Sequence, residues 1–229
     1  MSHQLPPTRT VLASAALLAL CVSVQADNQQ RVGVRGAVIN IGGGEGGVAD
    51  QEFGSTGGVA GRNEQSVTVN GAVINLAGSN ASARTSLASV GGRVSGTNRQ
   101  SVHVTGALIN AAGASGDAQL NAASVGGSMT GANVQQAVVV GVVTNLAEGA
   151  GSAGVNLAAV RGSVTGANAQ RAIVGGLIVN SAGPGGVAQV NVASRRGSVG
   201  GNAQTAVVFG AIVNHAGGGA SIVNINSDY

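Results

Sequence analysis

The chain has 229 residues, of which 40 are Gly, 8% are charged and 1% are aromatic. Its 11 basic and 8 acidic side chains give a net charge of +3, and the basic residues are scattered Arg with no Lys. Binding to nucleic acid needs a basic stripe or a platform of aromatic side chains, so we exclude that class of function.

The first 26 residues have the features of a secretory signal peptide. Arg9 gives this segment a positive start, and the apolar run of residues 11–24 is too short to span a membrane comfortably. A cleavage site of small residues follows and ends at Ala26. We therefore expect residues 1–26 to be removed, and the secreted mature chain to begin at Asp27. No later apolar run predicts a transmembrane helix.

Cys21 is the single cysteine of the chain, and it lies within the predicted signal peptide. Attachment of a lipid at Cys21 is a weaker alternative, because the bulky Leu20 precedes it. If the segment is cleaved, the mature chain has no disulfide, and its stability must come from repetition and packing.

Residues 27–229 form one predicted domain built on a repeat of 35 residues, which shortens to 34 near the C-terminus. Three series of amide side chains mark the repeat. The first series is Asn40, Asn75, Asn110, Asn145, Asn180 and Asn214; the second is Asn28, Asn63, Asn98, Asn133, Asn168 and Asn202; the third is Gln30, Gln65, Gln100, Gln135, Gln170 and Gln204. A fixed period of this size indicates stacked units. The units are residues 28–62, 63–97, 98–132, 133–167, 168–201 and 202–229.

The first half of each unit reads as a β-strand with one confined face. In the second unit the residues at every other position from Gln65 to Ala77 keep their chemistry in the other units, whereas the residues between them vary. A period of two with one fixed face indicates a strand. A turn rich in Gly follows, and in the fifth unit it contains Pro184, outside any strand.

The second half of each unit predicts another strand, whose confined positions in the third unit include Asn121, Ala123 and Val125. Each strand would be about twelve residues long, on the order of 40 Å. If Asn75 lies near Ala88, the large side chains of the two strands meet: Val73 meets Val90 and Val69 meets Val94. We expect an all-β fold, a two-sheet β-solenoid of about six strand–turn–strand coils.

The amide series occupy inward positions of these strands, where each amide can hydrogen-bond to its copies in the coils above and below. An unpaired buried amide costs about 1–3 kcal/mol, and a continuous ladder removes that cost everywhere except at the two ends. Neither end of the repeat offers a helix or a dense block of charge as a cap. We favour open ends, which add further chains, over a capped monomer.

The outward face of the first strand is apolar. Its residues include Ala72, Ile74, Leu76, Ala107, Ile109, Val140, Val142 and Leu146. A dissolved solenoid normally carries more charge there. This face predicts lateral contact, adhesion to a surface or a second buried layer.

The sequence supplies no catalytic residues, cofactor-binding residues or metal ligands, so we do not expect an enzyme. The eight carboxylates do not recur in register; the closest group is Glu45, Asp50 and Glu52, which reads as a solvated end. His103 and His215 lie at different outward positions. The Gly-rich run of residues 42–47 precedes no helix and is a weak phosphate loop.

The repeats resemble those of bacterial functional amyloid subunits. Curlin subunits carry Gln and Asn at fixed inward positions of strand–turn–strand repeats, as this chain does. Fap-type fibre subunits carry Gly-Val-Asn-x-Ala-Ala-like segments, which residues 154–159 resemble, with weaker copies at residues 120–124 and 190–194. The resemblance implies self-association into fibres of a biofilm matrix or cell surface after passage through an outer-membrane export machinery.

We therefore expect a secreted structural protein that stacks end to end into an extracellular fibre, with the Asn and Gln series setting the register. The alternative is a monomeric or surface-attached solenoid adhesin that binds through its flat apolar face. A solenoid enzyme such as a polysaccharide lyase is disfavoured by the lack of a carboxylate cluster.

Overall fold

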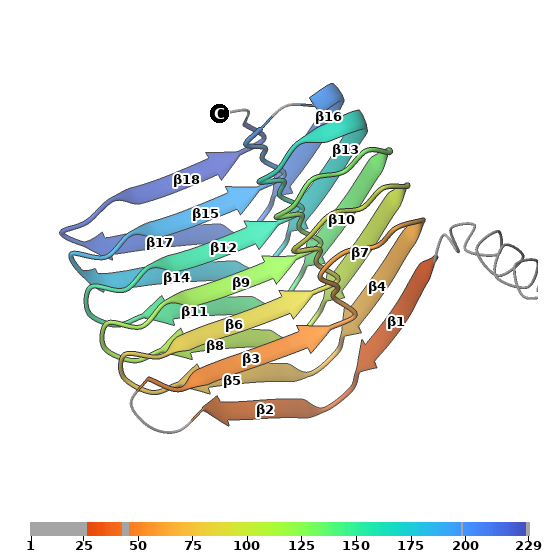
Figure 1. Cartoon of the computed structure of the whole chain (residues 1–229). Coiled ribbons are helices and arrows are strands. Elements are labelled where there is room, and N and C mark those ends of the chain that lie inside the picture. Colours follow the sequence, from red (N-terminus) through yellow and green to blue (C-terminus); the bar gives the residue numbers. More distant parts are fainter. Residues whose placement is uncertain (1–26, 43–45, 198, 228–229) are drawn as a thin grey trace, which may run out of the picture.

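The computed structural model describes residues 27–42, 46–197 and 199–227. Its regular secondary structure consists of 18 β-strands in three parallel sheets of six, and every coil contributes one strand to each sheet (Figure 1). The prediction of an all-β solenoid with about six coils of 35 residues is confirmed. The predicted signal peptide, residues 1–26, lies outside the described residues.

The three sheets are named here in chain order. Sheet A contains β1 (Asn28–Val34), β4 (Asn63–Val69), β7 (Asn98–Val104), β10 (Asn133–Val139), β13 (Val164–Val174) and β16 (Val199–Val208). Sheet B contains β2 (Ala37–Gly42), β5 (Ala72–Ala77), β8 (Ala107–Ala112), β11 (Val142–Ala147), β14 (Leu177–Pro184) and β17 (Ala211–Gly217). Sheet C contains β3 (Val48–Phe53), β6 (Ser82–Leu87), β9 (Ala118–Ala122), β12 (Ala153–Leu157), β15 (Ala188–Val192) and β18 (Ser221–Ile225).

The coils stack in register, so that each residue lies opposite its equivalent one repeat later. Asn28 pairs with Asn63, and Asn63 pairs with Asn98. The residues at one such position form a column along the solenoid axis. Val is the commonest apolar residue in the inward columns of sheets A and B, beside the columns of Asn and Gln, and a β-branched side chain packs well on a pleated surface. The period of the sequence is therefore the length of one coil.

The structure differs from the two-sheet prediction, because the first predicted strand bends into β4 and β5 around Gly71. Successive coils approach so closely there that a Cβ built on Gly106 would lie 1.7 Å from the carbonyl oxygen of Gly71. Only glycine fits this approach. The predicted strand thus contributes to two sheets, A and B, and each coil takes part in three.

The turn between sheets B and C is where the sequence predicted a reversal. Residues at this turn have positive φ, including Asn80 (52°), Ser115 (59°), Gly149 (66°) and Gly185 (75°). Gly and Asn tolerate this left-handed conformation better than other residues do. Pro184 is the last residue of β14, next to the bend, so the prediction that it lies outside any strand was wrong.

A second corner, which was not predicted from the sequence, follows sheet C. The residue after each sheet C strand is left-handed, with φ of 46° at Ala88, 49° at Ala123, 48° at Ala158 and 45° at Ala193. The corner ends the predicted second strand after about half its length. It also changes which side chains face inward: Leu120 and Ala122 are buried in β9, whereas Asn121 lies on the outer side. The predicted inward position of Asn121 was therefore wrong.

The predicted pairing of large side chains across the coil was also wrong. Val69 and Val73 pack in one cluster with Leu87, whereas Val90 and Val94 belong to a separate cluster beyond the Ala88 corner. Because the chain turns at that corner, Val90 and Val94 line a different part of the coil, where isolated bridges link neighbouring coils.

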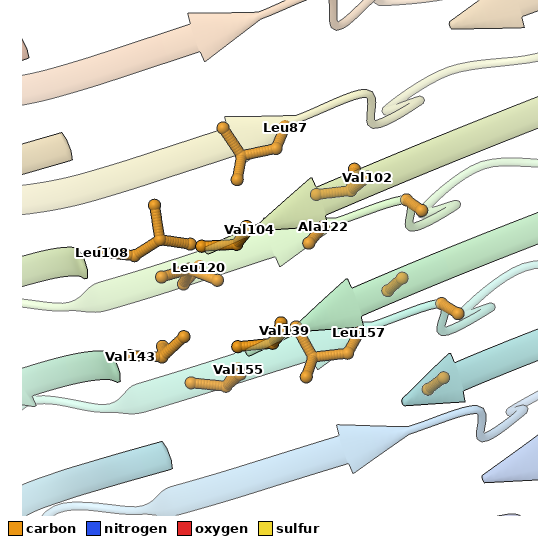
Figure 2. Close-up of a cluster of buried hydrophobic side chains, with 14 of the residues drawn as sticks. Leu87, Val102, Val104, Leu108, Leu120, Ala122, Val139, Val143, Val155 and Leu157 are labelled. Carbon is orange, nitrogen blue, oxygen red and sulfur yellow. The ribbon is translucent and has the colours of Figure 1, made fainter. Parts of the chain in front are cut away.

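The main core runs along the axis of the solenoid between the three sheets. Figure 2 shows its central part, where Val104, Leu108 and Leu120 of one coil pack above Val139, Val143 and Val155 of the next. These side chains are at most 1% exposed. Each coil thus supplies one layer of a continuous apolar column, and no coil has a core of its own.

Candidate functional site

The first Asn series forms an unbroken ladder inside sheet B. The Nδ2 atom of each Asn donates a hydrogen bond to Oδ1 of the Asn in the next coil toward the C-terminus. The distances are 2.9 Å for Asn40 to Asn75, 2.9 Å for Asn75 to Asn110, 2.7 Å for Asn110 to Asn145, 2.7 Å for Asn145 to Asn180 and 2.7 Å for Asn180 to Asn214. The middle members are fully buried.

These amides also join sheet B to sheet C across the interior. Nδ2 of Asn145 donates to the carbonyl oxygens of Ala118, at 3.1 Å, and Gly154, at 3.3 Å. Asn110 and Asn180 make equivalent pairs of bonds. One side chain per coil therefore links the coils to each other and two sheets within them.

We expect Asn145→Leu to lower the free energy of unfolding by about 3–5 kcal/mol. The change removes the hydrogen bonds of Asn145 to its two ladder neighbours and to the carbonyl oxygens of Ala118 and Gly154. It leaves Oδ1 of Asn180 without its ladder donor in a buried site, and each unpaired buried group costs about 1–3 kcal/mol. Urea denaturation followed by circular dichroism measures the loss. The matched control is Thr144→Leu, at the neighbouring outward position, which we expect to change stability by less than about 1 kcal/mol. Equal losses in the two variants would show that the ladder adds nothing.

The Gln series forms a second ladder, inside sheet A, and it runs in the opposite direction. Nε2 of each Gln donates to Oε1 of the Gln one coil nearer the N-terminus. The distances are 3.0 Å for Gln65 to Gln30, 3.1 Å for Gln100 to Gln65, 3.0 Å for Gln135 to Gln100, 3.3 Å for Gln170 to Gln135 and 3.0 Å for Gln204 to Gln170.

The Gln ladder explains the left-handed alanines. Nε2 of Gln100 donates to the carbonyl oxygen of Ala88 at 2.6 Å, and Gln135 does the same to Ala123 at 2.6 Å. A left-handed conformation costs a non-glycine residue about 1–2 kcal/mol. The buried hydrogen bond from Gln offsets that cost, so the amide column of sheet A holds the corner after sheet C.

The second Asn series forms a third ladder, at the start of the sheet A strands. Each Nδ2 donates toward the C-terminus, as from Asn63 to Asn98 at 2.6 Å and from Asn98 to Asn133 at 2.7 Å. Nδ2 of Asn98 also donates to Oε1 of Gln100 in its own coil at 3.0 Å. The two amide columns of sheet A are thus coupled to each other.

A fourth ladder, on the outer side of sheet C, was not identified from the sequence. Asn156 donates to Asn121, Asn191 to Asn156 and Asn224 to Asn191, each at 2.8 Å. The signal was present, because these residues also recur near the 35-residue period. The sequence pattern placed these Asn residues in an inward column. Because the chain turns at Ala123, they lie on the outer side of sheet C instead.

The outer side of sheet C also borders a polar groove that runs across several coils. A cavity of about 260 Å³ is lined by residues including Glu52, Arg84, Asn121, Asn156 and Arg161. Among its described lining residues Glu52 is the single carboxylate. The groove therefore offers no pair of acids of the kind that glycoside hydrolysis uses.

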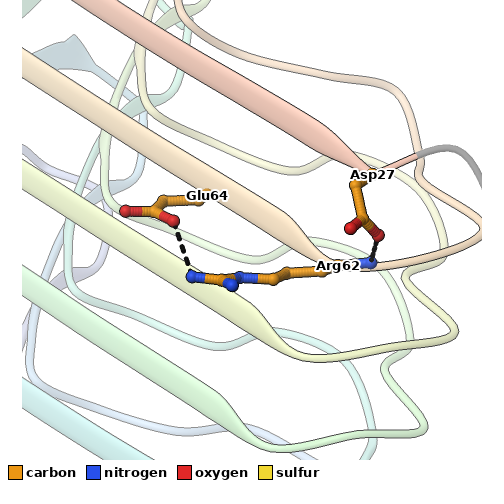
Figure 3. Close-up of polar contacts among 3 residues, drawn as sticks. All are labelled: Asp27, Arg62 and Glu64. Atoms are coloured by element: carbon orange, nitrogen blue, oxygen red, sulfur yellow. Dashed lines mark hydrogen bonds and ion pairs between the residues drawn. The ribbon is translucent and has the colours of Figure 1, made fainter.

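Two of the remaining carboxylates, Asp27 and Glu64, lie beside Arg62. Asp27 accepts a hydrogen bond from the backbone N–H of Arg62 at 2.9 Å, and the Arg62 guanidinium pairs with Glu64 at 2.8 Å (Figure 3). Exposed ion pairs of this kind contribute up to about 1 kcal/mol. His103 lies at an outward position of β7, and the described residues contain no group of three or more side chains suited to a metal. Glu45 lies outside the described residues.

Some inward side chains of the end coils are left exposed. Val38 in the first coil is 36% exposed, although its neighbour Val73 in the same column is 0% exposed. Val208 in the last coil is 37% exposed, although Val174 beside it is 0% exposed. The described strands at both ends therefore present apolar side chains and an unpaired sheet edge.

The two ladder directions make the ends complementary. At the first coil, Oδ1 of Asn40 and Nε2 of Gln30 have no ladder partner among the described coils. At the last coil, the corresponding groups are Nδ2 of Asn214 and Oε1 of Gln204. The first coil thus has an open acceptor on its Asn and an open donor on its Gln. The last coil has the matching donor on its Asn and the matching acceptor on its Gln.

At the last coil a serine partly satisfies the Asn ladder. Nδ2 of Asn214 donates to Oγ of Ser221 at 2.9 Å and to the carbonyl oxygen of Ile222 at 3.0 Å. Ser221 pairs with Ala188, and the other coils have alanine in this column. The serine hydroxyl takes the place of the missing next Asn in the isolated chain.

The described part of the chain contains no helix with the length and hydropathy needed to traverse a bilayer. Comparison of the chain with protein-family models, curated proteins and solved structures gives no match.

Proposed function

We propose that this chain is a secreted structural protein, the subunit of an extracellular functional amyloid fibre that grows by adding copies end to end. It has no catalytic role in this proposal. The observation that carries it is the complementarity of the two end coils, whose amide ladders run in opposite directions and end in matching donors and acceptors. A second copy placed on the last coil continues both ladders without changing their direction.

The end coils match in other respects. Stacking the first coil of one copy on the last coil of another covers Val38 and Val208, the inward apolar side chains that the single copy leaves exposed. The described part of the last coil, residues 199–227, has no Asp, Glu, Lys or Arg, so the charges of the first coil meet no like charge. Added copies are thus held by strand pairing, apolar burial and two ladders, which also set the register.

The mature chain, residues 27–229, should therefore form unbranched fibres when it is concentrated. We expect thioflavin fluorescence, and fibre diffraction with a reflection near 4.8 Å along the fibre axis, because the coils stack along that axis. Electron microscopy and diffraction of aligned fibres check this. A chain that stays monodisperse at the same concentrations would contradict the proposal.

The alternative function is a monomeric or surface-attached adhesin, and the exposed apolar side chains of sheet B favour it. Ile39 and Ile41 are 59% and 67% exposed. An adhesin of this kind binds its target as a single copy, so monodisperse protein that still adsorbs to an apolar surface would select it over the fibre.

A further inference from the structure

The outer face of sheet B, called here the sheet B face, carries no charged side chain. Three outward side chains from each of β2, β5, β8, β11, β14 and β17 form it, and the polar ones are Thr144, Ser181 and His215. The apolar members are Ala37, Ile39, Ile41, Ala72, Ile74, Leu76, Ala107, Ile109, Ala111, Val142, Leu146, Leu177, Val179, Ala211 and Val213.

This apolar character is specific to one face of the solenoid. The outward positions of sheet A include Arg31, Glu64 and Arg99, and those of sheet C include Glu52 and Arg84. The chain therefore has charges on its other two faces and excludes them from sheet B. A contiguous apolar face of this kind marks a contact with another surface.

The dimensions of the sheet B face indicate what that surface is. Six strands about 4.8 Å apart and about six residues long cover on the order of 500 Å². Two such faces in contact bury on the order of 1,000 Å², which is at the lower limit for a specific protein interface. Two single copies therefore bind weakly. In a pair of filaments, each built from copies stacked end to end, the same contact repeats at every subunit. The gains in binding free energy then add along the length of the pair.

We propose that the sheet B face joins two filaments of this same chain side by side, so that the mature fibre contains two filaments. The inference rests on the proposed end-to-end assembly. Both faces have ridges of apolar side chains with the same spacing of about 4.8 Å, and two such faces interdigitate as a dry zipper. Pairing follows elongation, because only long filaments accumulate enough contact.

The test introduces two positive charges into the centre of the face, as Ile109→Lys with Val179→Lys in the mature chain. Both side chains are partly exposed and point outward, so a single filament accommodates the change. The matched control is Thr68→Lys with Val138→Lys, which places two lysines on the outward side of sheet A, also two coils apart. Mass per unit length, from scanning transmission electron microscopy, is measured for fibres of all three proteins.

We expect the face variant to form fibres with half the mass per length of the original chain, and the control to keep the full value. Single filaments in the original chain would overturn the lateral contact and leave end-to-end assembly standing. Paired filaments in the face variant would place the contact on another surface and also overturn the inference. If the original chain forms no fibres, the proposed function fails as well.

Discussion

The substitution Val208→Asp should lower the rate of fibre elongation at least about 100-fold. Val208 is 37% exposed at the end coil of a single copy, where a carboxylate can remain hydrated. In a fibre the same position would be covered by Val34 of the next copy, since the column contains Val69, Val104, Val139 and Val174 at 0% exposure. Burying an unpaired carboxylate costs at least about 3 kcal/mol, which corresponds to about a hundredfold change.

The control is Val207→Asp, which carries the same charge one residue earlier. Val207 pairs with Ile173 in an outward column of sheet A, so its carboxylate stays in water after stacking. Seeded elongation measured by thioflavin fluorescence should be unchanged in this variant to within about threefold, because surface charges shift such equilibria by less than about 1 kcal/mol.

The Val208→Asp variant should also terminate the growth of fibres made by the original chain. Its first coil is intact, so it can add to the last coil of a growing fibre, but its own last coil then accepts no further copy. Small amounts of Val208→Asp should therefore stop elongation of the original chain. Equal elongation of the Val207→Asp and Val208→Asp proteins would show that the last coil is not a growth surface.

The substitution Gly106→Ala should destabilise the solenoid by about 4 kcal/mol or more, the range reached when an atom is forced into occupied space. The added Cβ would lie 1.7 Å from the carbonyl oxygen and 2.7 Å from the carbonyl carbon of Gly71. Both atoms belong to the backbone, so no side chain can move aside. Relief requires the second and third coils to separate, which breaks the 2.9 Å hydrogen bond from the N–H of Ala107 to Gly71.

Gly154→Ala is the matched control, because a Cβ at Gly154 has no atom within 4 Å. Glycine lowers the stability of a strand by about 0.5–1 kcal/mol relative to alanine, so the control should be neutral or slightly stabilising. Thermal and urea denaturation measure both variants. We expect Gly106→Ala to melt at a much lower temperature, or to unfold in two steps if the stack divides between these coils. Similar melting of the two variants would contradict the close approach at Gly71.

The coil length and the ladders could be predicted because repetition is visible in a single sequence. Asn75 and Asn110 are equivalent only if the coil has 35 residues, and in-register stacking then brings their amides together. The turn at Asn80 was also predictable, because Gly, Asn and Ser cluster there.

Other features depend on packing that the sequence pattern does not express. Ala88 adopts a positive φ although alanine normally avoids it, and its stabilising partner, Gln100, lies in the following coil. The position of that corner decides which side chains of sheet C face inward. Because the sequence does not reveal the corner, the sequence pattern placed Asn121 on the inward side. Gly71 looks like one more residue of an alternating strand until the backbone of the neighbouring coil is placed beside it.

The directions of the ladders also could not be predicted from the sequence. Whether Nδ2 of Asn110 points up or down the axis depends on the carbonyl groups of Ala83 and Gln119, which fix the amide. The complementarity of the two ends follows from those directions. A series of amides in a sequence indicates stacking, but it does not indicate polarity.

The most direct test of end-to-end assembly joins the two ends of neighbouring copies covalently. In residues 27–229, which have no cysteine of their own, Gln29→Cys with Ala203→Cys places two cysteines on the outward side of sheet A, in the first and the last coil. Within one copy the two positions are five strands apart, about 24 Å, and no disulfide can form. In a head-to-tail fibre they lie on adjacent strands about 4.8 Å apart, within the range that a disulfide spans.

Oxidation of these fibres should yield a ladder of covalent multimers on a non-reducing gel, and neither single-cysteine variant should form dimers. Dimers from Gln29→Cys alone or from Ala203→Cys alone would show that like ends meet, and monomers from the double variant would show that the end coils do not meet at all.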